Sequence, residues 1–282
     1  MAFDAATGQM IAFGTVVTQA GNWPAPDTWV WDGTRWGQAA TTGATPPTRL
    51  GASLAYDPVR KVVIMHGGYD QRTNWLNDVW AWNGTGWAQL SPANSPPADG
   101  YVREQPLCWD GQKGVVLMVN EQGNAGGIAN PVQTWSWDGS TWTQMAVAGA
   151  PSLGIGFQFM AVAYDSARKV TVMFSQVNGV PTTWTFDGTS WAQAATSGTV
   201  AMSFAMGADD AHSRMVIFGS AGDTWTWDGS KWTVQTPLHS PPGGGIYAMA
   251  YDPDRHVVVL LANEPSGTQT WTWNGSDWTP RA

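Results

Sequence analysis

The sequence predicts an all-β protein, a six-bladed β-propeller in which every blade is a four-stranded antiparallel sheet. The main observation is a Trp-rich stretch that recurs six times, at intervals of about 41 to 55 residues. All but three of the twenty Trp residues lie in its copies. Repeats of several short strands at this period are typical of propeller blades, which pack side by side into a ring. The copies are Thr28–Trp36, Val79–Trp87, Thr134–Trp142, Thr183–Trp191, Thr224–Trp232 and Thr270–Trp278.

Two further segments precede the Trp-rich stretch in each repeat and are predicted to be strands A and B of a blade. The first is a short Ala-rich segment that ends in Tyr-Asp or a close variant, and the second is a continuous apolar run. Short β-branched runs between turns are typical of strands that are buried on both faces. The first segments are Met1–Asp4, Gly51–Asp57, Gln105–Asp110, Phe159–Asp165, Ser203–Asp209 and Tyr247–Asp252. The apolar runs are Met10–Phe13, Val62–Met65, Val115–Val119, Val170–Phe174, Met215–Phe218 and Val257–Leu261.

The Trp-rich stretch itself predicts a hairpin of strands C and D. Trp29 and Trp31 are two residues apart, so they share one face of a strand. The Asp32-Gly33 pair supplies the positive-φ residue that a tight turn needs. Trp36 then returns on the partner strand close to Trp31, and cross-strand aromatic pairs of this kind stabilise sheets. Because the same Trp positions recur in every repeat, we interpret them as packing residues between blades.

The second repeat carries residues that resemble the kelch-type β-propeller family. They are Pro46–Gly51 at the start of strand A, His66-Gly67-Gly68 at the end of strand B, Asn77–Trp80 in strand C and Trp87 in strand D. The double glycine occurs in this repeat alone, and the hairpin spacing is shorter than in the kelch pattern. The resemblance implies a kelch-like propeller fold, and it implies little about function, because propellers serve many functions.

Residues 1–282 are expected to form a single propeller domain. Its blades span about 1–38, 48–90, 100–145, 154–195, 201–236 and 244–279. Few residues are left for strand A of the first blade. We therefore expect either a domain excised from a longer chain or a first blade with a short inner strand, and ring closure by packing between blades.

Composition limits the possible partners. The formal net charge is −8, with four Lys and no basic run, so nucleic-acid binding is disfavoured. The single cysteine, Cys108, excludes an intrachain disulfide and a cysteine-based metal cluster. No apolar run is long enough to span a membrane, and no signal peptide is present. We expect a monomer, and the composition slightly favours an extracytoplasmic or secreted location.

Strand order sorts the connections onto two faces. The short A–B and C–D turns lie on one face, here the turn face, and the variable B–C and D–A connections lie on the other, here the loop face. Function usually resides in variable loops on a rigid scaffold, so a ligand site is expected on the loop face and at the mouth of the central channel. The arginines of the A–B turns are expected to be solvated; they are Arg60, Arg168, Arg214 and Arg255.

The loop face of the second and third blades gathers the best candidate ligand residues. Arginines supply planar donors for a carboxylate or sulfate, and aromatic residues beside them can stack on a sugar or anchor a peptide. The alternatives are ion pairs that stabilise the loops, and Trp side chains that pack against their own loops. The candidates are Trp23, Arg49, His66, Tyr69, Asp70, Arg72, Trp75, Tyr101, Arg103, Glu104 and Glu121.

Catalytic motifs are weak in this sequence. Glu121 and Glu264 follow strand B in opposite blades and could act as an acid/base pair, although two solvated loop carboxylates are the simpler interpretation. No histidines are spaced as metal ligands, and no metal or cofactor is predicted. A copper oxidase with a kelch-like propeller needs a Tyr–Cys crosslink and a His pair, which Cys108 in an inner strand does not fit. Trp109, in the same strand, is interpreted as core.

Three functions therefore stay open. The favoured one is a binding module that recognises a peptide, protein or glycan through the loop face. The second is a glycosidase or lyase at the channel mouth, and the third is a structural or sensor domain of a larger bacterial protein.

Overall fold

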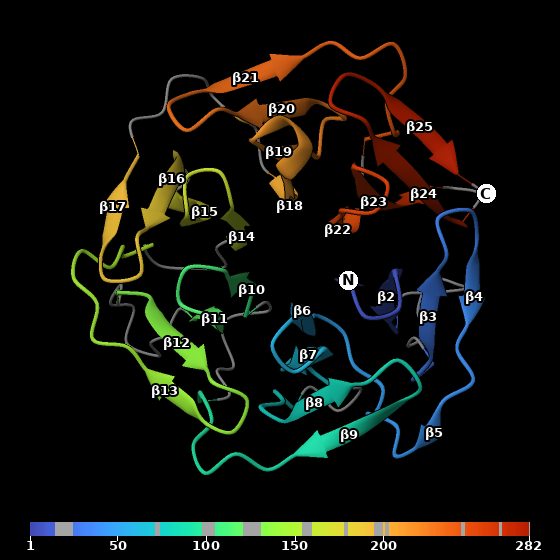
Figure 1. Ribbon diagram of the computed structural model, residues 1–282. Helices are drawn as coiled ribbons and strands as arrows, with labels where there is room; N and C mark the ends of the chain where they lie inside the picture. The colour runs from blue at the N-terminus through green and yellow to red at the C-terminus, as the bar shows by residue number, and fades with distance from the viewer. Residues whose placement is uncertain are drawn as a thin grey trace.

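The protein is a closed ring of six β-sheets around a central axis, as a computed structural model shows (Figure 1). Five sheets have four strands, and the sheet of blade 2 has a fifth. Within each blade the strands follow chain order from the centre to the rim and pair antiparallel, so the predicted propeller is confirmed. The structure describes residues 1–14, 25–70, 74–97, 105–120, 131–153, 160–177, 180–194, 200, 203–243, 246–264 and 267–281.

The strands, blade by blade, have the following bounds. Blade 1 contains β1 (Ala2–Asp4), β2 (Gln9–Phe13), β3 (Thr28–Trp31) and β4 (Trp36–Gln38). Blade 2 contains β6 (Ser53–Asp57), β7 (Val62–His66), β8 (Val79–Trp82) and β9 (Gly86–Leu90), with β5 (Thr42–Gly43) parallel to β9 at the rim. Blade 3 contains β10 (Leu107–Asp110), β11 (Val115–Asn120), β12 (Gln133–Trp137) and β13 (Trp142–Gln144). Blade 4 contains β14 (Met160–Asp165), β15 (Val170–Val177), β16 (Val180–Phe186) and β17 (Trp191–Gln193). Blade 5 contains β18 (Ser203–Asp209), the 3₁₀ turn η1 (Asp210–His212), β19 (Arg214–Gly219), β20 (Thr224–Trp227) and β21 (Trp232–Gln235). Blade 6 contains β22 (Ile246–Asp252), β23 (Val257–Glu264), β24 (Gly267–Trp273) and β25 (Trp278–Arg281). In the described parts of the chain no helix is long and apolar enough to cross a membrane.

The hydrophobic core lies between the blades. In one cluster Ile11 and Phe13 of blade 1 pack with Met65, Trp82 and Trp87 of blade 2. The C-strand and D-strand aromatic residues are direct cross-strand partners, as Trp82 and Trp87 are in blade 2. The Trp-rich stretch therefore serves packing between neighbouring blades, as predicted.

The D-strand tryptophans also form a ladder of hydrogen bonds that links the blades. Trp232 Nε1 of blade 5 donates to Thr183 Oγ1 of blade 4 over 2.8 Å, and both side chains are buried. The equivalent bonds join Trp87 to Thr28, Trp191 to Thr134, Trp278 to Thr224 and Trp36 to Thr270. The last of these joins blade 1 to blade 6 and closes the ring. The inner strand of blade 1, β1, has three residues.

One position breaks this ladder. Val79 stands in blade 2 where the other blades have Thr, and the buried Nε1 of Trp142 consequently has no partner. Thr183→Val should therefore lower the free energy of unfolding by about 1–2 kcal/mol, because it leaves Trp232 Nε1 unpaired. Val79→Thr should raise it by about 1 kcal/mol, because it supplies an acceptor for Trp142. Urea denaturation measures both, and effects of the same sign would contradict this account.

The Asp-Gly turns are held by their own side chains. In blade 1 the carboxylate of Asp32 accepts hydrogen bonds from the Thr34 and Arg35 backbone amides, and from the Thr34 hydroxyl at 2.6 Å. These hydrogen bonds lower the pKa of Asp32 to about 2. Asp187 and Asp228 occupy the same place in blades 4 and 5, and side-chain and backbone hydrogen bonds lower their pKa values to about 2 as well.

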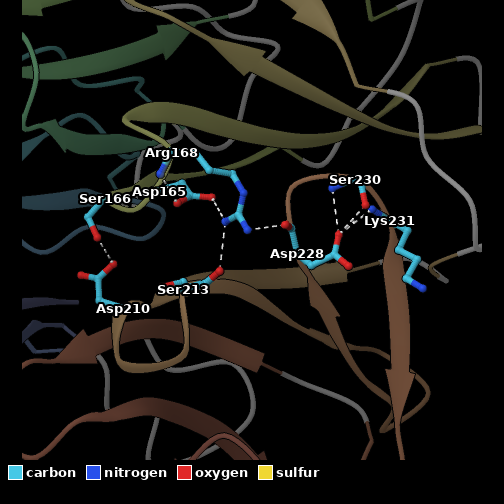
Figure 2. A network of polar contacts seen from close by, with 8 residues as sticks. All are labelled: Asp165, Ser166, Arg168, Asp210, Ser213, Asp228, Ser230 and Lys231. Atoms are coloured by element: carbon cyan, nitrogen blue, oxygen red, sulfur yellow. Dashed lines mark hydrogen bonds and ion pairs between the residues drawn. The ribbon is translucent and has the colours of Figure 1, made fainter.

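Three partly exposed arginines of the A–B turns, Arg60, Arg168 and Arg255, contact the neighbouring blade. Figure 2 shows Arg168 of blade 4, whose guanidinium bonds the Asp165 carboxylate at 2.8 Å and the Ser213 carbonyl of blade 5 at 3.0 Å. It also donates to the Asp228 carbonyl in the C–D turn of blade 5 and lies 5.8 Å from the centre of the Trp227 ring. In every blade, the residue three positions after the final Asp of strand A lies against the glycine in the C–D turn of the next blade. The pairs are Thr7 with Gly84, Arg60 with Gly139, Lys113 with Gly188, Arg168 with Gly229, His212 with Gly275 and Arg255 with Gly33.

Arg60, Arg168 and Arg255 are thus partly exposed, as expected for turn arginines, but they also make contacts that the sequence did not reveal. Each pairs with the buried aspartate that ends strand A of its own blade. A carboxylate that is removed from water needs such a partner, which explains why the turn sequence places Arg three residues after the Asp.

Candidate functional site

The structure describes five of the predicted ligand residues. Arg49, His66, Tyr69, Asp70 and Trp75 all belong to blade 2 or to the chain leading into it. The other predicted residues lie outside the described residues, so their arrangement stays a prediction. They are Trp23, Arg72, Tyr101, Arg103, Glu104 and Glu121.

Arg49 is buried, and its guanidinium is occupied within the protein. Its two terminal nitrogens reach the carboxylate oxygens of Asp78 at 2.5 and 2.8 Å, and further N–H groups donate to the carbonyls of Pro47 and Gly67. Asp78 also accepts from Trp80 Nε1 at 2.7 Å. Burial alone would raise the pKa of Asp78, but the hydrogen bonds and charge of Arg49 hold it below its ordinary value. Arg49 thus fixes the start of strand A against strand C.

Tyr69 and Trp75 form an aromatic pair on the loop face of blade 2. Their ring centres are 5.4 Å apart and both side chains are half-buried. The loop that carries them is fastened by Asp70, whose carboxylate accepts from the backbone amide and the side-chain amide of Asn74 at 2.8 and 2.9 Å. At its base, Gly68 has φ +88°, and a Cβ there would lie 2.6 Å from the Leu50 carbonyl. Only glycine lets the two segments approach so closely.

At the end of β7 and in the adjoining part of blade 3, several buried polar atoms lack a well-formed hydrogen bond. They are both ring nitrogens of His66, Oε1 of Gln105 and Nε1 of Trp142, and the Gln105 side chain lies close enough to His66 to act on its pKa. His66 packs edge-on against Trp142, with ring centres 5.5 Å apart. The equivalent aromatic pairs elsewhere in the ring use Phe, which has no polar atoms; they are Phe13 with Trp87, Phe174 with Trp232 and Phe218 with Trp278. Blade 2 therefore departs from the repeat by placing a histidine where phenylalanine would pack without loss of hydrogen bonds.

His66 is expected to make the stability of the fold depend on pH. Burial lowers its pKa to about 4, whereas in the unfolded chain it stays near the ordinary value. Between about pH 6.5 and 4 the imidazole of His66 binds a proton in the unfolded chain but stays neutral in the folded protein. The free energy of unfolding should therefore fall by roughly 3 kcal/mol as the pH falls through this window, and should be unaffected by His66 above it.

His66→Phe tests this expectation by removing the titrating group and restoring the packing of the other blades. Urea denaturation at a series of pH values should show a flatter profile for this variant between about pH 4 and 6.5. His256→Asn serves as the control, because His256 is exposed and its loss should leave the profile close to that of the parent. A profile unchanged by His66→Phe would contradict the assigned role.

A cavity of about 370 Å³ occupies the centre of the ring, and it opens toward the turn face. Strand A of each blade contributes one residue to each of three layers that are stacked along the axis of the ring. The outer layer is the one next to the A–B turns, and the innermost layer is the one farthest from them. The innermost layer is apolar, with Met1, Leu54, Leu107, Val162, Met206 and Met249. The middle layer has small residues only, namely Ala2, Ala55, Cys108, Ala163, Gly207 and Ala250. The outer layer is aromatic in five of six blades, with Phe3, Tyr56, Trp109, Tyr164, Ala208 and Tyr251.

The sequence did not reveal this cavity. Trp109 packs against the core cluster between blades 2 and 3, as predicted, and it also lines the cavity wall. The signal was the aromatic residue that precedes the final Asp of strand A. Tyr56, Tyr164 and Tyr251 recur there in alternate blades, and burial raises the pKa of each phenol. These tyrosines are neutral hydrogen-bonding groups around the mouth of the cavity.

The reactive groups of the cavity wall are few. Burial raises the pKa of the Cys108 thiol to about 12, so the sulfur is a protonated thiol rather than a nucleophilic thiolate. Among the described residues no three His, Cys, Asp or Glu side chains gather in a way that could hold a metal ion. What the described cavity offers is therefore recognition by shape and by aromatic surface.

Comparisons with known proteins show likeness in fold. No protein-family model matches the chain, and no curated protein sequence matches it. The structure of YjhT is similar, with a TM-score of 0.58 and 14% identity over 91% of both chains. A nidogen/laminin complex gives a TM-score of 0.57 and 10% identity, covering 92% of this chain and 91% of the other. The SapL1 lectin in complex with α-methyl fucoside gives 0.53 and 16%, covering 90% and 86%. At these identities the likeness shows the fold alone, that of a six-bladed β-propeller.

Proposed function

We propose that the protein is a monomeric binding module that recognises a polar ligand, foremost a glycan, through the loop face of blades 2 and 3. The observation that carries this proposal is the half-buried Tyr69–Trp75 pair, whose ring centres lie 5.4 Å apart on the loop face. Aromatic rings stack on the apolar faces of sugar rings, and nearby polar groups give orientation. A glycan combines both needs in one ligand.

The local architecture supports a preorganised site. The Arg49–Asp78 pair and the Asp70–Asn74 bonds fix the base and the edge of the loop, so the aromatic pair keeps its geometry before a ligand arrives. A rigid site avoids the entropic cost of ordering side chains on binding. The remaining predicted residues of this sector, Arg72 and Arg103 among them, would add donors for acidic groups of the ligand.

Two of the similar structures bear on this proposal by their ligands. One is a lectin with α-methyl fucoside, and another contains nidogen with laminin. They illustrate that this fold accommodates both glycan and protein partners. We further propose a kelch-type relationship, for which blade 2 offers the support, since Arg49, Gly67, Gly68 and Asp78 form one connected contact set there.

Glycan and peptide arrays probed with the intact protein test the proposed function. Binding to a set of related glycans is expected, and Trp75→Ala should weaken it by about tenfold or more, as loss of a central aromatic contact does. Val59→Ala is the matched control, because Val59 is 65% exposed on the opposite face. Binding confined to peptides would replace the glycan by a peptide ligand. Equal losses in both variants, or no binding on either array, would overturn the proposal.

A further inference from the structure

The central cavity has a composition that the proposed glycan site does not use. Its outer layer surrounds the mouth with Phe3, Tyr56, Trp109, Tyr164 and Tyr251, and only blade 5 interrupts this layer, with Ala208. The middle layer of Ala, Cys and Gly residues leaves the volume open, because no side chain there is large enough to fill the axis. The result is a space of about 370 Å³, within the usual size range of small-molecule sites.

Asp210 is the one charged side chain among the described residues that line this cavity. It lies at the mouth, exposed to solvent, directly beyond the gap that Ala208 leaves in the aromatic layer. Its carboxylate accepts a hydrogen bond from Ser166 Oγ of blade 4 at 2.7 Å, as Figure 2 shows. Tyr251 of blade 6 lines the same cavity as Asp210.

The three paired arginines of the turn face do not line the cavity. Arg60, Arg168 and Arg255 pair with buried aspartates and lie over the turn glycines of the next blades, so none of them lines the cavity. The mouth is therefore an aromatic enclosure beside one carboxylate side chain, and this combination attracts organic cations through cation–π and ionic contacts.

We propose that the central cavity binds a small organic cation, with its hydrophobic body inside the aromatic layer and its charged group between Asp210 and Tyr251. An anion is disfavoured, because the described lining has no Arg or Lys side chain, and burial lowers the pKa of the Met1 α-amino group to about 6. A fully apolar ligand is disfavoured as well, because it would make no ionic contact with the Asp210 carboxylate. The site lies on the turn face and is independent of the proposed glycan site on the loop face.

Isothermal titration with phenyltrimethylammonium tests this proposal, with tert-butylbenzene as its neutral isostere and benzoate as an anion of similar size. The cation is expected to bind with one-to-one stoichiometry and more tightly than either of the other two. Asp210→Asn should weaken cation binding by about tenfold, in the range of an ion pair combined with an aromatic contact. Asp254→Asn is the matched control, since Asp254 is an exposed carboxylate on the same face outside the cavity lining, and it should change binding by less than about twofold.

Ala208→Tyr provides a second test through shape. It gives blade 5 the residue that blades 2, 4 and 6 already carry, closes the gap and should abolish binding of the cation. Circular dichroism checks that each variant keeps the fold, and Asp210→Asn stays decisive if Ala208→Tyr fails to fold. The proposal is overturned by equal affinity for tert-butylbenzene, by preference for benzoate, by absence of cation binding, or by equal effects of Asp210→Asn and Asp254→Asn.

Discussion

Trp137→Ala is expected to lower the free energy of unfolding by about 3–5 kcal/mol. Trp137 ends strand C of blade 3 and is 1% exposed, with its ring centre 5.4 Å from that of Trp142. It belongs to a cluster that includes Ile64 and Val79 of blade 2, so the truncation opens a void at an interface between two blades. The loss combines the transfer free energy of the indole with the cost of the cavity.

Chemical denaturation followed by tryptophan fluorescence measures this loss. Thr143→Ala is a suitable control, because Thr143 is exposed on the adjacent strand β13 and its truncation should cost less than about 0.5 kcal/mol. A loss below about 1 kcal/mol for Trp137→Ala would show that the Trp-rich hairpin does not carry the core.

Gly229→Ala is expected to destabilise the protein by about 3–5 kcal/mol, for two reasons. Its φ is +98°, a backbone conformation that strains any residue with a Cβ. The added Cβ would also lie 2.0 Å from Nε of Arg168, so the guanidinium must leave its place. Asp165, which is 3% exposed, then loses its ionic partner in a buried setting.

The two causes can be separated by experiment. Gly114→Ala introduces a Cβ at φ +69° with no atom within 4 Å, so it reports backbone strain alone and should cost about 1 kcal/mol. In a background of Arg168→Ala the cost of Gly229→Ala should fall by about half, because the displaced group is already absent. Strict additivity of Gly229→Ala and Arg168→Ala would contradict the assigned contact.

The sequence predicted the fold well because the determining signals were local and repeated. The spacing of Trp31, Trp36 and their equivalents determines a hairpin, and six hairpins at one period determine a ring. The role of Arg168 was misjudged for the opposite reason. Its partners Ser213 and Asp228 are 45 and 60 residues away, and no local pattern reveals a neighbour across a blade boundary.

The same distinction between local sequence signals and long-range contacts applies to the candidate sites. His66 could be singled out because it stands at the end of a strand next to two glycines, but the loss of hydrogen bonds around it appears only against the Phe pairs of other blades. The central cavity draws one residue per layer from each blade, so its aromatic layer is spread over the whole chain. Tyr56, Tyr164 and Tyr251 become neighbours of one space only once the ring has closed.

The residue three positions after the final Asp of strand A alternates around the ring between arginine and other residues. Blades 2, 4 and 6 share the pattern Tyr-Asp-x-x-Arg, as in Tyr164–Arg168, and their arginines bond buried aspartates. Blades 1, 3 and 5 carry Thr7, Lys113 and His212 at the arginine place, and in blade 1 an oxygen of Asp4 has no partner. In blade 5 His212 instead contacts the Asp209 carboxylate at 2.8 Å. Arg60, Arg168 and Arg255 each reach the turn glycine of the following blade, so they tie the six blades into three pairs, blade 2 with 3, blade 4 with 5 and blade 6 with 1.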